Sequence, residues 1–89
     1  MTEIADGDVR GEIRAYIEEN FLYLHPGIEV KDDDDFLALG IVDSLGFVEL
    51  VEEVQSRYGV TVQDIEITEE NFGSIEAIRG YVERKQSVA

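Results

Sequence analysis

Apolar residues recur at intervals of three and four near the start of the chain, the spacing that places side chains on one face of a helix. This stripe consists of Val9, Ile13, Tyr16, Ile17, Phe21 and Leu24. It predicts an amphipathic helix over residues 8–23, with Asp6 or Asp8 as its N-cap. Pro26 and Gly27 are expected to stop this helix.

The next segment, residues 24–42, does not keep a helical pattern for long and is predicted to be a loop. The run from Asp32 to Asp35 suits an exposed connection. The side chains expected to hold the loop on the core are Phe36, Leu37, Leu39 and Ile41. A loop of this length in a compact domain is usually functional or anchored by its own side chains.

A second helix is predicted to begin at Asp43 or Ser44, to run to about Tyr58 and to end at Gly59. Its apolar stripe consists of Phe47, Leu50, Val51, Val54 and Tyr58. The spacing of this stripe is again that of a helix with one buried face.

The C-terminal third predicts a short connection and two further helical segments. Residues 60–67 alternate as a strand would, but this single short candidate has no evident pairing partner. Thr68 is expected to cap a brief turn over 69–72, and Ser74 a last helix that frays at Lys85 and Gln86. We therefore predict an all-α domain spanning residues 1–89, with three long helices, one very short helix and a long first loop.

The charge balance excludes several functions for this chain of 89 residues. Seven Lys and Arg face 21 Asp and Glu, giving a net charge of −14. Such a surface disfavours nucleic acid and anionic membranes, which attract clustered positive charge.

The absence of cysteine excludes a thiol nucleophile and cysteine-based zinc sites. With no secretory signal and no apolar run long enough to cross a membrane, we expect a cytoplasmic protein.

Two candidate sites have simpler explanations. His25 is the single histidine, and without a recognisable nucleophile partner it is expected to be an exposed loop residue. A calcium loop starting at Asp32 would place Phe36, Leu37 and Asp43 where an oxygen ligand, glycine and glutamate are required. We therefore predict a solvated acidic run and no metal site, with calcium-responsive binding as a weaker alternative.

The sequence Asp43-Ser44-Leu45 lies at the predicted start of the second helix. One explanation is an N-cap, in which Asp43 or Ser44 accepts a hydrogen bond from a free backbone N–H. A serine in the first turn also exposes its hydroxyl at the positive end of the helix dipole, where an attached phosphate would be stabilised. A preceding acid can help to hold a metal ion during phosphoryl transfer.

The chain resembles the acyl carrier protein family in three stretches, Gly40-Ile41-Val42-Asp43-Ser44-Leu45, Val48-Glu49-Leu50-Val51 and Tyr58-Gly59-Val60. The resemblance implies a four-helix bundle with a long loop between the first and second helices and a short third helix. It also implies a non-catalytic carrier in which Ser44 bears 4′-phosphopantetheine through a phosphodiester. A transferase would install this arm from coenzyme A with Mg²⁺, assisted by Asp43. The arm would supply the thiol that the chain lacks.

The resemblance further implies that partners dock on the second helix. Apolar contacts would come from Leu45 and Val48, and acidic contacts from Glu49, Glu52 and Glu53. The expected partners are a phosphopantetheinyl transferase, acyl- or aminoacyl-loading enzymes and downstream synthases with basic docking surfaces. Rim charges mainly set the association rate and orientation, which suits a monomeric shuttle. The alternative is an ordinary solvated helix face.

Two residues depart from the pattern of the fatty-acid carriers. Gly46 stands where those carriers usually have an acid, and near a helix start it costs up to about 1 kcal/mol of helix stability. Glu52 stands where they often have an apolar residue.

The expected function is therefore an acyl carrier for a fatty-acid-like, polyketide or specialised pathway. The alternatives are an aminoacyl or peptidyl carrier, or an acidic protein-interaction module without a prosthetic group.

Overall fold

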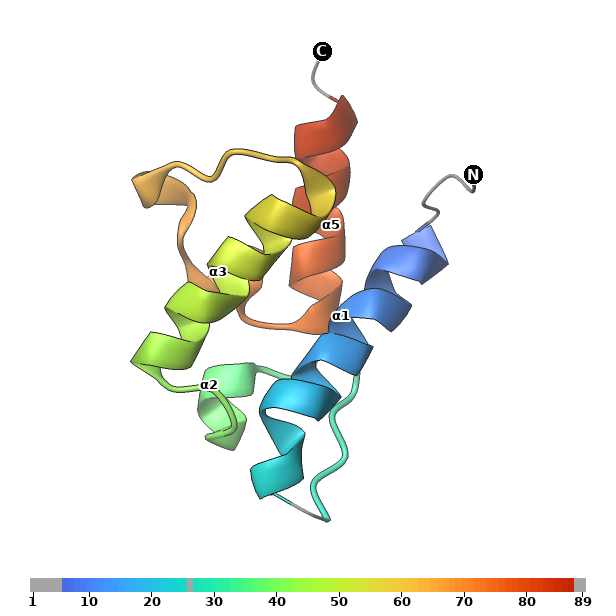
Figure 1. Ribbon diagram of the computed structural model, residues 1–89, viewed down its shortest axis with the longest axis vertical. Coiled ribbons are helices and arrows are strands. Elements are labelled where there is room, and N and C mark those ends of the chain that lie inside the picture. Colours follow the sequence, from blue (N-terminus) through green and yellow to red (C-terminus); the bar gives the residue numbers. More distant parts are fainter. Residues whose placement is uncertain (1–5, 26, 88–89) are drawn as a thin grey trace.

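The computed structural model describes residues 6–25 and 27–87, which form helices joined by loops (Figure 1). The elements in chain order are α1 (Asp6–Asn20), η1 (Leu22–Leu24), α2 (Phe36–Leu39), α3 (Ser44–Tyr58), η2 (Asp64–Glu66), α4 (Glu69–Phe72) and α5 (Ile75–Ser87), where η denotes a 3₁₀ helix. These described residues contain no strand, so the all-α prediction is confirmed. None of the described helices has the length and apolar character needed to cross a membrane.

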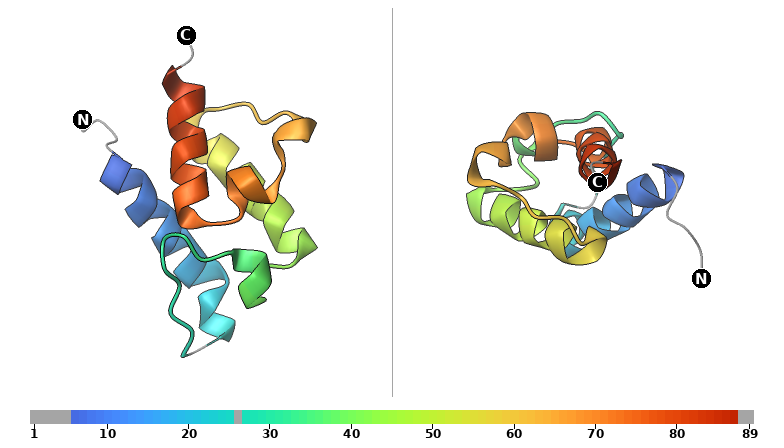
Figure 2. Two further views of the ribbon diagram at one scale, coloured as in Figure 1. Left: turned by 180° about the vertical axis from the view of Figure 1, so that it is seen from behind. Right: turned by 90° about the horizontal axis from the view of Figure 1, so that it is seen from above.

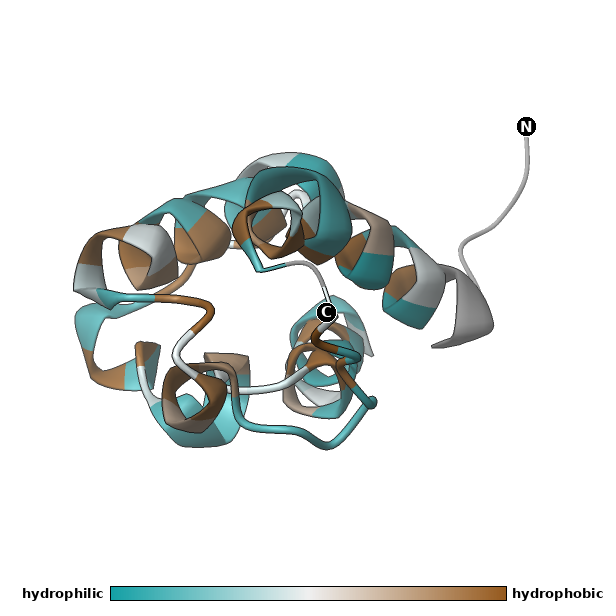
Figure 3. Ribbon diagram, turned by 90° about the horizontal axis from the view of Figure 1, so that it is seen from below, coloured by the Kyte–Doolittle hydropathy of each residue, from teal (hydrophilic) through white to brown (hydrophobic). Residues whose placement is uncertain are grey.

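The long helices α1, α3 and α5 surround one apolar core (Figure 2). Figure 3 shows apolar and polar stretches alternating along each helix, as expected of elements with one buried face. The largest fully buried side chains are Tyr81, Phe36, Phe72, Ile13, Ile17 and Leu50. The ring of Phe72 lies 4.8 Å from that of Tyr81 and 6.3 Å from that of Phe47, measured between ring centroids. These aromatic contacts connect α4 to both α3 and α5.

The first helix ends three residues earlier than predicted, at Asn20 instead of residue 23. The chain then tightens into η1, where the backbone N–H of His25 donates to the carbonyl of Leu22 at 2.9 Å. This tighter winding leaves Leu24 65% exposed, so the prediction that it continues the buried stripe is wrong. Asp6 and Asp8 lie within α1, and the residue before the helix is outside the described residues, as is Pro26.

The long loop contains a helix that the sequence pattern did not predict. Asp35 caps α2 by accepting hydrogen bonds from the backbone N–H groups of Leu37 and Ala38, at 2.9 and 3.2 Å. Phe36 is fully buried as expected. Leu39 is 39% exposed, contrary to prediction, because the chain turns at Gly40 (φ 74°) and Ile41 takes the next core position.

Backbone hydrogen bonds attach this loop to the α4–α5 junction. The N–H of Phe36 donates to the carbonyl of Gly73 at 2.7 Å, and the N–H of Glu76 donates to the carbonyl of Asp32 at 2.8 Å. The acidic run therefore contributes to the fold, through the Asp32 carbonyl and the Asp35 cap. Among the described residues, no three metal-ligating side chains gather into a cluster.

The remaining predicted boundaries depend on short-range caps, and most of them are confirmed. Gly59 (φ 66°) ends α3, the Thr68 hydroxyl accepts from the N–H of Asn71 at 3.3 Å, and the Ser74 hydroxyl accepts from that of Ala77 at 3.0 Å. Within residues 60–67, Asp64–Glu66 form η2 and none of these residues forms a strand. The last helix does not fray at Lys85, because the ammonium of Lys85 pairs with Glu66 at 3.2 Å.

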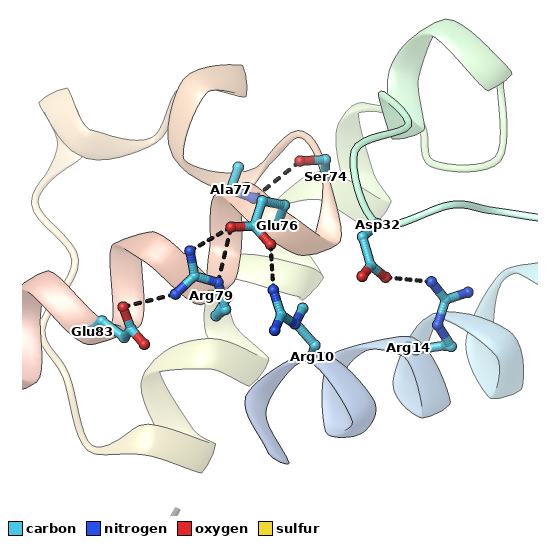
Figure 4. Close-up of polar contacts among 8 residues, drawn as sticks. All are labelled: Arg10, Arg14, Asp32, Ser74, Glu76, Ala77, Arg79 and Glu83. Atoms are coloured by element: carbon cyan, nitrogen blue, oxygen red, sulfur yellow. Dashed lines mark hydrogen bonds and ion pairs between the residues drawn. The ribbon is translucent and has the colours of Figure 1, made fainter. Parts of the chain in front are cut away.

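Arginine side chains join α1 to the loop and to α5 (Figure 4). Arg10 contacts Glu76 at 2.9 Å, Arg14 contacts Asp32 at 2.5 Å, and Arg79 pairs with Glu76 and Glu83. Arg79 and then Arg10 hold the pKa of Glu76 below its ordinary value. Stabilisation from a lowered carboxyl pKa is complete above the ordinary pKa and is lost as the pH falls through the folded value. Because these groups are partly exposed, each pair contributes modestly.

We predict that Phe36→Ala lowers the free energy of unfolding by about 3–5 kcal/mol, because it leaves a cavity beneath α2. Leu39→Ala, in the same short helix but exposed, should change it by no more than about 0.5 kcal/mol. Urea unfolding followed by circular dichroism measures both. Equal losses in the two variants would contradict the anchoring role of Phe36.

Candidate functional site

Ser44 is the first residue of α3, and its side chain is exposed. The residues that lead into it, Ile41 and Val42, are 4% and 2% exposed. Two residues beyond it, Gly46 is buried as well. The chain is therefore held on the core on both sides of Ser44, which fixes the position of its hydroxyl at the surface.

Asp43 is the N-cap of α3, which settles the choice between Asp43 and Ser44. One of its carboxylate oxygens, Oδ1, accepts a hydrogen bond of 2.8 Å from the backbone N–H of Gly46. The second oxygen belongs to an exposed side chain and can still face a cation in solvent. Asp43 thus starts the helix and keeps a negative charge beside the serine.

The first turn of α3 fits an attached phosphodiester. A helix leaves its first N–H groups without partners inside the helix, and the cap of Asp43 occupies that of Gly46. The N–H groups of Ser44 and Leu45 remain for solvent or for a phosphate on the serine. The helix dipole favours negative charge at the same end.

Close packing against Phe21 explains why residue 46 is a glycine, and the local sequence does not show this contact. A Cβ atom built at this residue would lie 2.7 Å from Cε1 of Phe21 and 3.3 Å from the Asp43 carboxylate. The ring of Phe21, just beyond the end of α1, therefore packs directly against the backbone of the first turn of α3. An acidic side chain has no room at this position.

A cavity of about 300 Å³ lies between η1 and the start of α3. Its lining residues are Asn20, Phe21, Leu24, His25, Gly40, Ile41, Asp43, Leu45, Gly46 and Glu49. His25, expected in an exposed loop, is half-buried here. Sequence reasoning did not connect residues 20–25 with Ser44, because only the tertiary packing of η1 against α3 brings them together.

The predicted partner-binding residues share the exposed side of α3, with one difference among them. Leu45 and Val48 are 69% and 49% exposed, and Glu49 and Glu52 are also exposed. Glu53 is half-buried and accepts hydrogen bonds from Nε and Nη2 of Arg57, at 2.8 and 2.5 Å. Its charge is therefore partly balanced within α3, whereas Glu49 and Glu52 add negative charge near Ser44.

The sequence matches one protein family and several named relatives. The family described as the phosphopantetheine attachment site matches residues 12–82. A D-alanyl carrier protein of Streptococcus suis (strain 05ZYH33) is 39% identical over 77 residues, covering 85% of this chain and 94% of the relative. Another, from Streptococcus suis (strain 98HAH33), is 35% identical with the same coverage. A D-alanyl carrier protein of Streptococcus thermophilus (strain ATCC BAA-491 / LMD-9) is 32% identical over 73 residues, covering 80% of this chain and 86% of the relative.

We predict that Gly46→Ala lowers the free energy of unfolding by about 1–3 kcal/mol, because the added methyl group must displace the ring of Phe21. Helix propensity alone would favour alanine by about 1 kcal/mol. Gly11→Ala is the matched control: Gly11 lies in α1 with nothing within 4 Å of an added Cβ, and this change should stabilise the fold. Thermal unfolding of both variants, and of Gly46→Ala combined with Phe21→Leu, tests the contact. Stabilisation by Gly46→Ala would contradict it.

Proposed function

This chain belongs to the family of proteins with a phosphopantetheine attachment site, and from that premise we propose that it carries a D-alanyl group on an arm attached to Ser44. As a member of this family it is a carrier protein with covalently attached 4′-phosphopantetheine, and it is not itself an enzyme. The arm supplies a thiol that holds the cargo as a thioester.

The choice of Ser44 is supported by the surroundings of the serines in the matched region. Residues 12–82 contain Ser44, Ser56 and Ser74. The hydroxyl of Ser74 caps α5 by accepting from the N–H of Ala77, and Ser56 lies near the C-terminal end of α3. Ser44 alone of the three combines exposure with the positive end of a long helix and an adjacent exposed carboxylate, Asp43.

Asp43 and the first turn of α3 would have different roles when the arm is attached to Ser44. The side chain of Asp43 presents one oxygen to the helix and one to solvent, where it can help a transferase to place Mg²⁺ near Ser44. The serine oxygen would form a bond to the pantetheine-bearing phosphorus of coenzyme A and lose its proton to a base of the transferase or to solvent. The pyrophosphate bond would break, and adenosine 3′,5′-bisphosphate would leave. The free N–H groups at the helix start then face the new negative charge.

A D-alanyl cargo is supported by the names of the relatives described above. These names favour the aminoacyl alternative over a fatty-acid or polyketide cargo. The partners would then be a phosphopantetheinyl transferase, a ligase that activates the amino acid and loads the thiol, and an enzyme that removes it. The exposed apolar and acidic side chains of α3 offer these partners a docking surface.

We predict that incubation with coenzyme A, Mg²⁺ and a broad-specificity phosphopantetheinyl transferase adds the mass of one phosphopantetheine to the wild-type protein. Ser44→Ala should gain nothing, whereas Ser56→Ala, in the same helix, should be modified like the wild type. Intact-protein mass spectrometry measures all three. Modification of Ser44→Ala would exclude Ser44 as the attachment site.

We predict that the arm-bearing protein, incubated with ATP, D-alanine and a D-alanine-activating ligase, gains the mass of one alanyl group. Hydroxylamine should remove this mass, because it cleaves thioesters. Ser44→Ala and the protein without its arm serve as controls. A protein that accepts malonyl or acetyl groups from their transferases but no D-alanine would overturn the proposed cargo and leave the proposed attachment intact.

A further inference from the structure

The cavity between η1 and α3 lies next to Ser44, the proposed attachment residue. Asp43 and Leu45, the chain neighbours of Ser44, both line it, as does Glu49 one turn further along α3. Ser44 itself does not line the cavity, so a group tethered to its hydroxyl starts beside the cavity and has to turn back into it. A short flexible tether gives its free end an effective concentration in the millimolar range, so weak contacts are enough to hold it there part of the time.

The lining of the cavity combines an apolar part with acceptors for a cation. Phe21 and Leu24 provide the apolar part. The carboxylates of Asp43 and Glu49 provide negative charge, and the Asn20 side chain adds a carbonyl oxygen while its amide nitrogen donates to the carbonyl of Tyr16. Among the described residues that line this cavity there is no lysine or arginine, and His25 is the one basic side chain.

We propose that this cavity receives the aminoacyl end of the carried arm, with the ammonium group of the cargo held by the carboxylate of Glu49. The inference rests on the proposed function, and the cargo property that this cavity would select is its positive charge. A positively charged α-ammonium is attracted to the two carboxylates, and a negatively charged cargo such as a malonyl group is repelled by them.

The size of the cavity agrees with a small cargo. A volume of about 300 Å³ is at the lower end of the range for small-molecule sites. The volume is sufficient for an alanyl group, and the cavity is partly open to solvent.

Nuclear magnetic resonance of the ¹⁵N-labelled, arm-bearing protein tests this proposal. Two stable arms are installed on Ser44 from coenzyme A analogues: D-alanyl joined by an amide, and isobutyryl joined in the same way. The isobutyryl group has a methyl group where alanyl has its ammonium, so the two arms differ in charge but hardly in shape. The readout is the change in the backbone amide shifts of Gly40, Gly46 and Phe21 relative to the unloaded arm.

We expect the alanyl arm to move these amide shifts at least twice as far as the isobutyryl arm. Glu49→Gln should remove at least half of the difference between the two arms. Glu52→Gln is the matched control, because it removes the same charge from the same exposed side of α3 but does not line the cavity, and it should leave the difference unchanged.

Equal shifts for the two arms, or an equal difference in Glu49→Gln and Glu52→Gln, would overturn the proposal. These outcomes leave the proposed function standing, since the arm would still have been attached at Ser44. Failure to attach either arm, seen as no gain in mass, would instead overturn the proposed function together with the inference.

Discussion

The contact between the ring of Phe21 and the backbone of Gly46 fixes the start of α3, and the candidate site depends on it. A Cβ at residue 46 would lie only 2.7 Å from Cε1 of that ring, so a larger residue here would have to displace the ring or the helix. This contact, together with the Asp43 cap, determines where the hydroxyl of Ser44 reaches the surface. The same contact forms one wall of the cavity beside Ser44. A residue without a side chain thus influences both the position of Ser44, the proposed attachment point, and the space next to it.

The distribution of charge completes this arrangement. Arg10 and Arg14 pair with acids of α5 and the loop, Arg57 pairs with Glu53, and Lys85 pairs with Glu66. The basic side chains in these pairs stabilise the fold away from the start of α3. The exposed predicted partner-binding side chains of α3, Leu45, Val48, Glu49 and Glu52, are apolar or acidic, in a chain with a net charge of −14. Such a field attracts basic partners and raises the rate of encounter without requiring tight binding.

Features set by near neighbours in the chain could be predicted from the sequence, and features set by distant ones could not. The limits of α3 follow from Asp43 at one end and Gly59 at the other. The sequence predicts the end at Gly59 and leaves Asp43 and Ser44 as alternatives for the cap. In contrast, α2 has a local cap in Asp35, but its four residues are too few to show a helical period. Its position depends on the hydrogen bond from the N–H of Phe36 to the carbonyl of Gly73, far away in the sequence. For the candidate site, Ser44 and Asp43 could be identified from a local motif. The contribution of η1 could not, because no local pattern shows that Phe21 meets Gly46.

Glu49 lies both in the proposed cargo cavity and on the proposed docking surface, and this overlap would give the carrier a way to release its cargo. It lines the cavity beside Ser44, and it lies on the exposed side of α3 among the side chains expected to meet partners. A basic side chain of a docking enzyme and the ammonium of the cargo would compete for the same carboxylate. Docking would therefore weaken the hold on the cargo at the moment when an enzyme is present to take it. An exposed ion pair is weak enough for this exchange, since such pairs contribute about 0.2–1 kcal/mol.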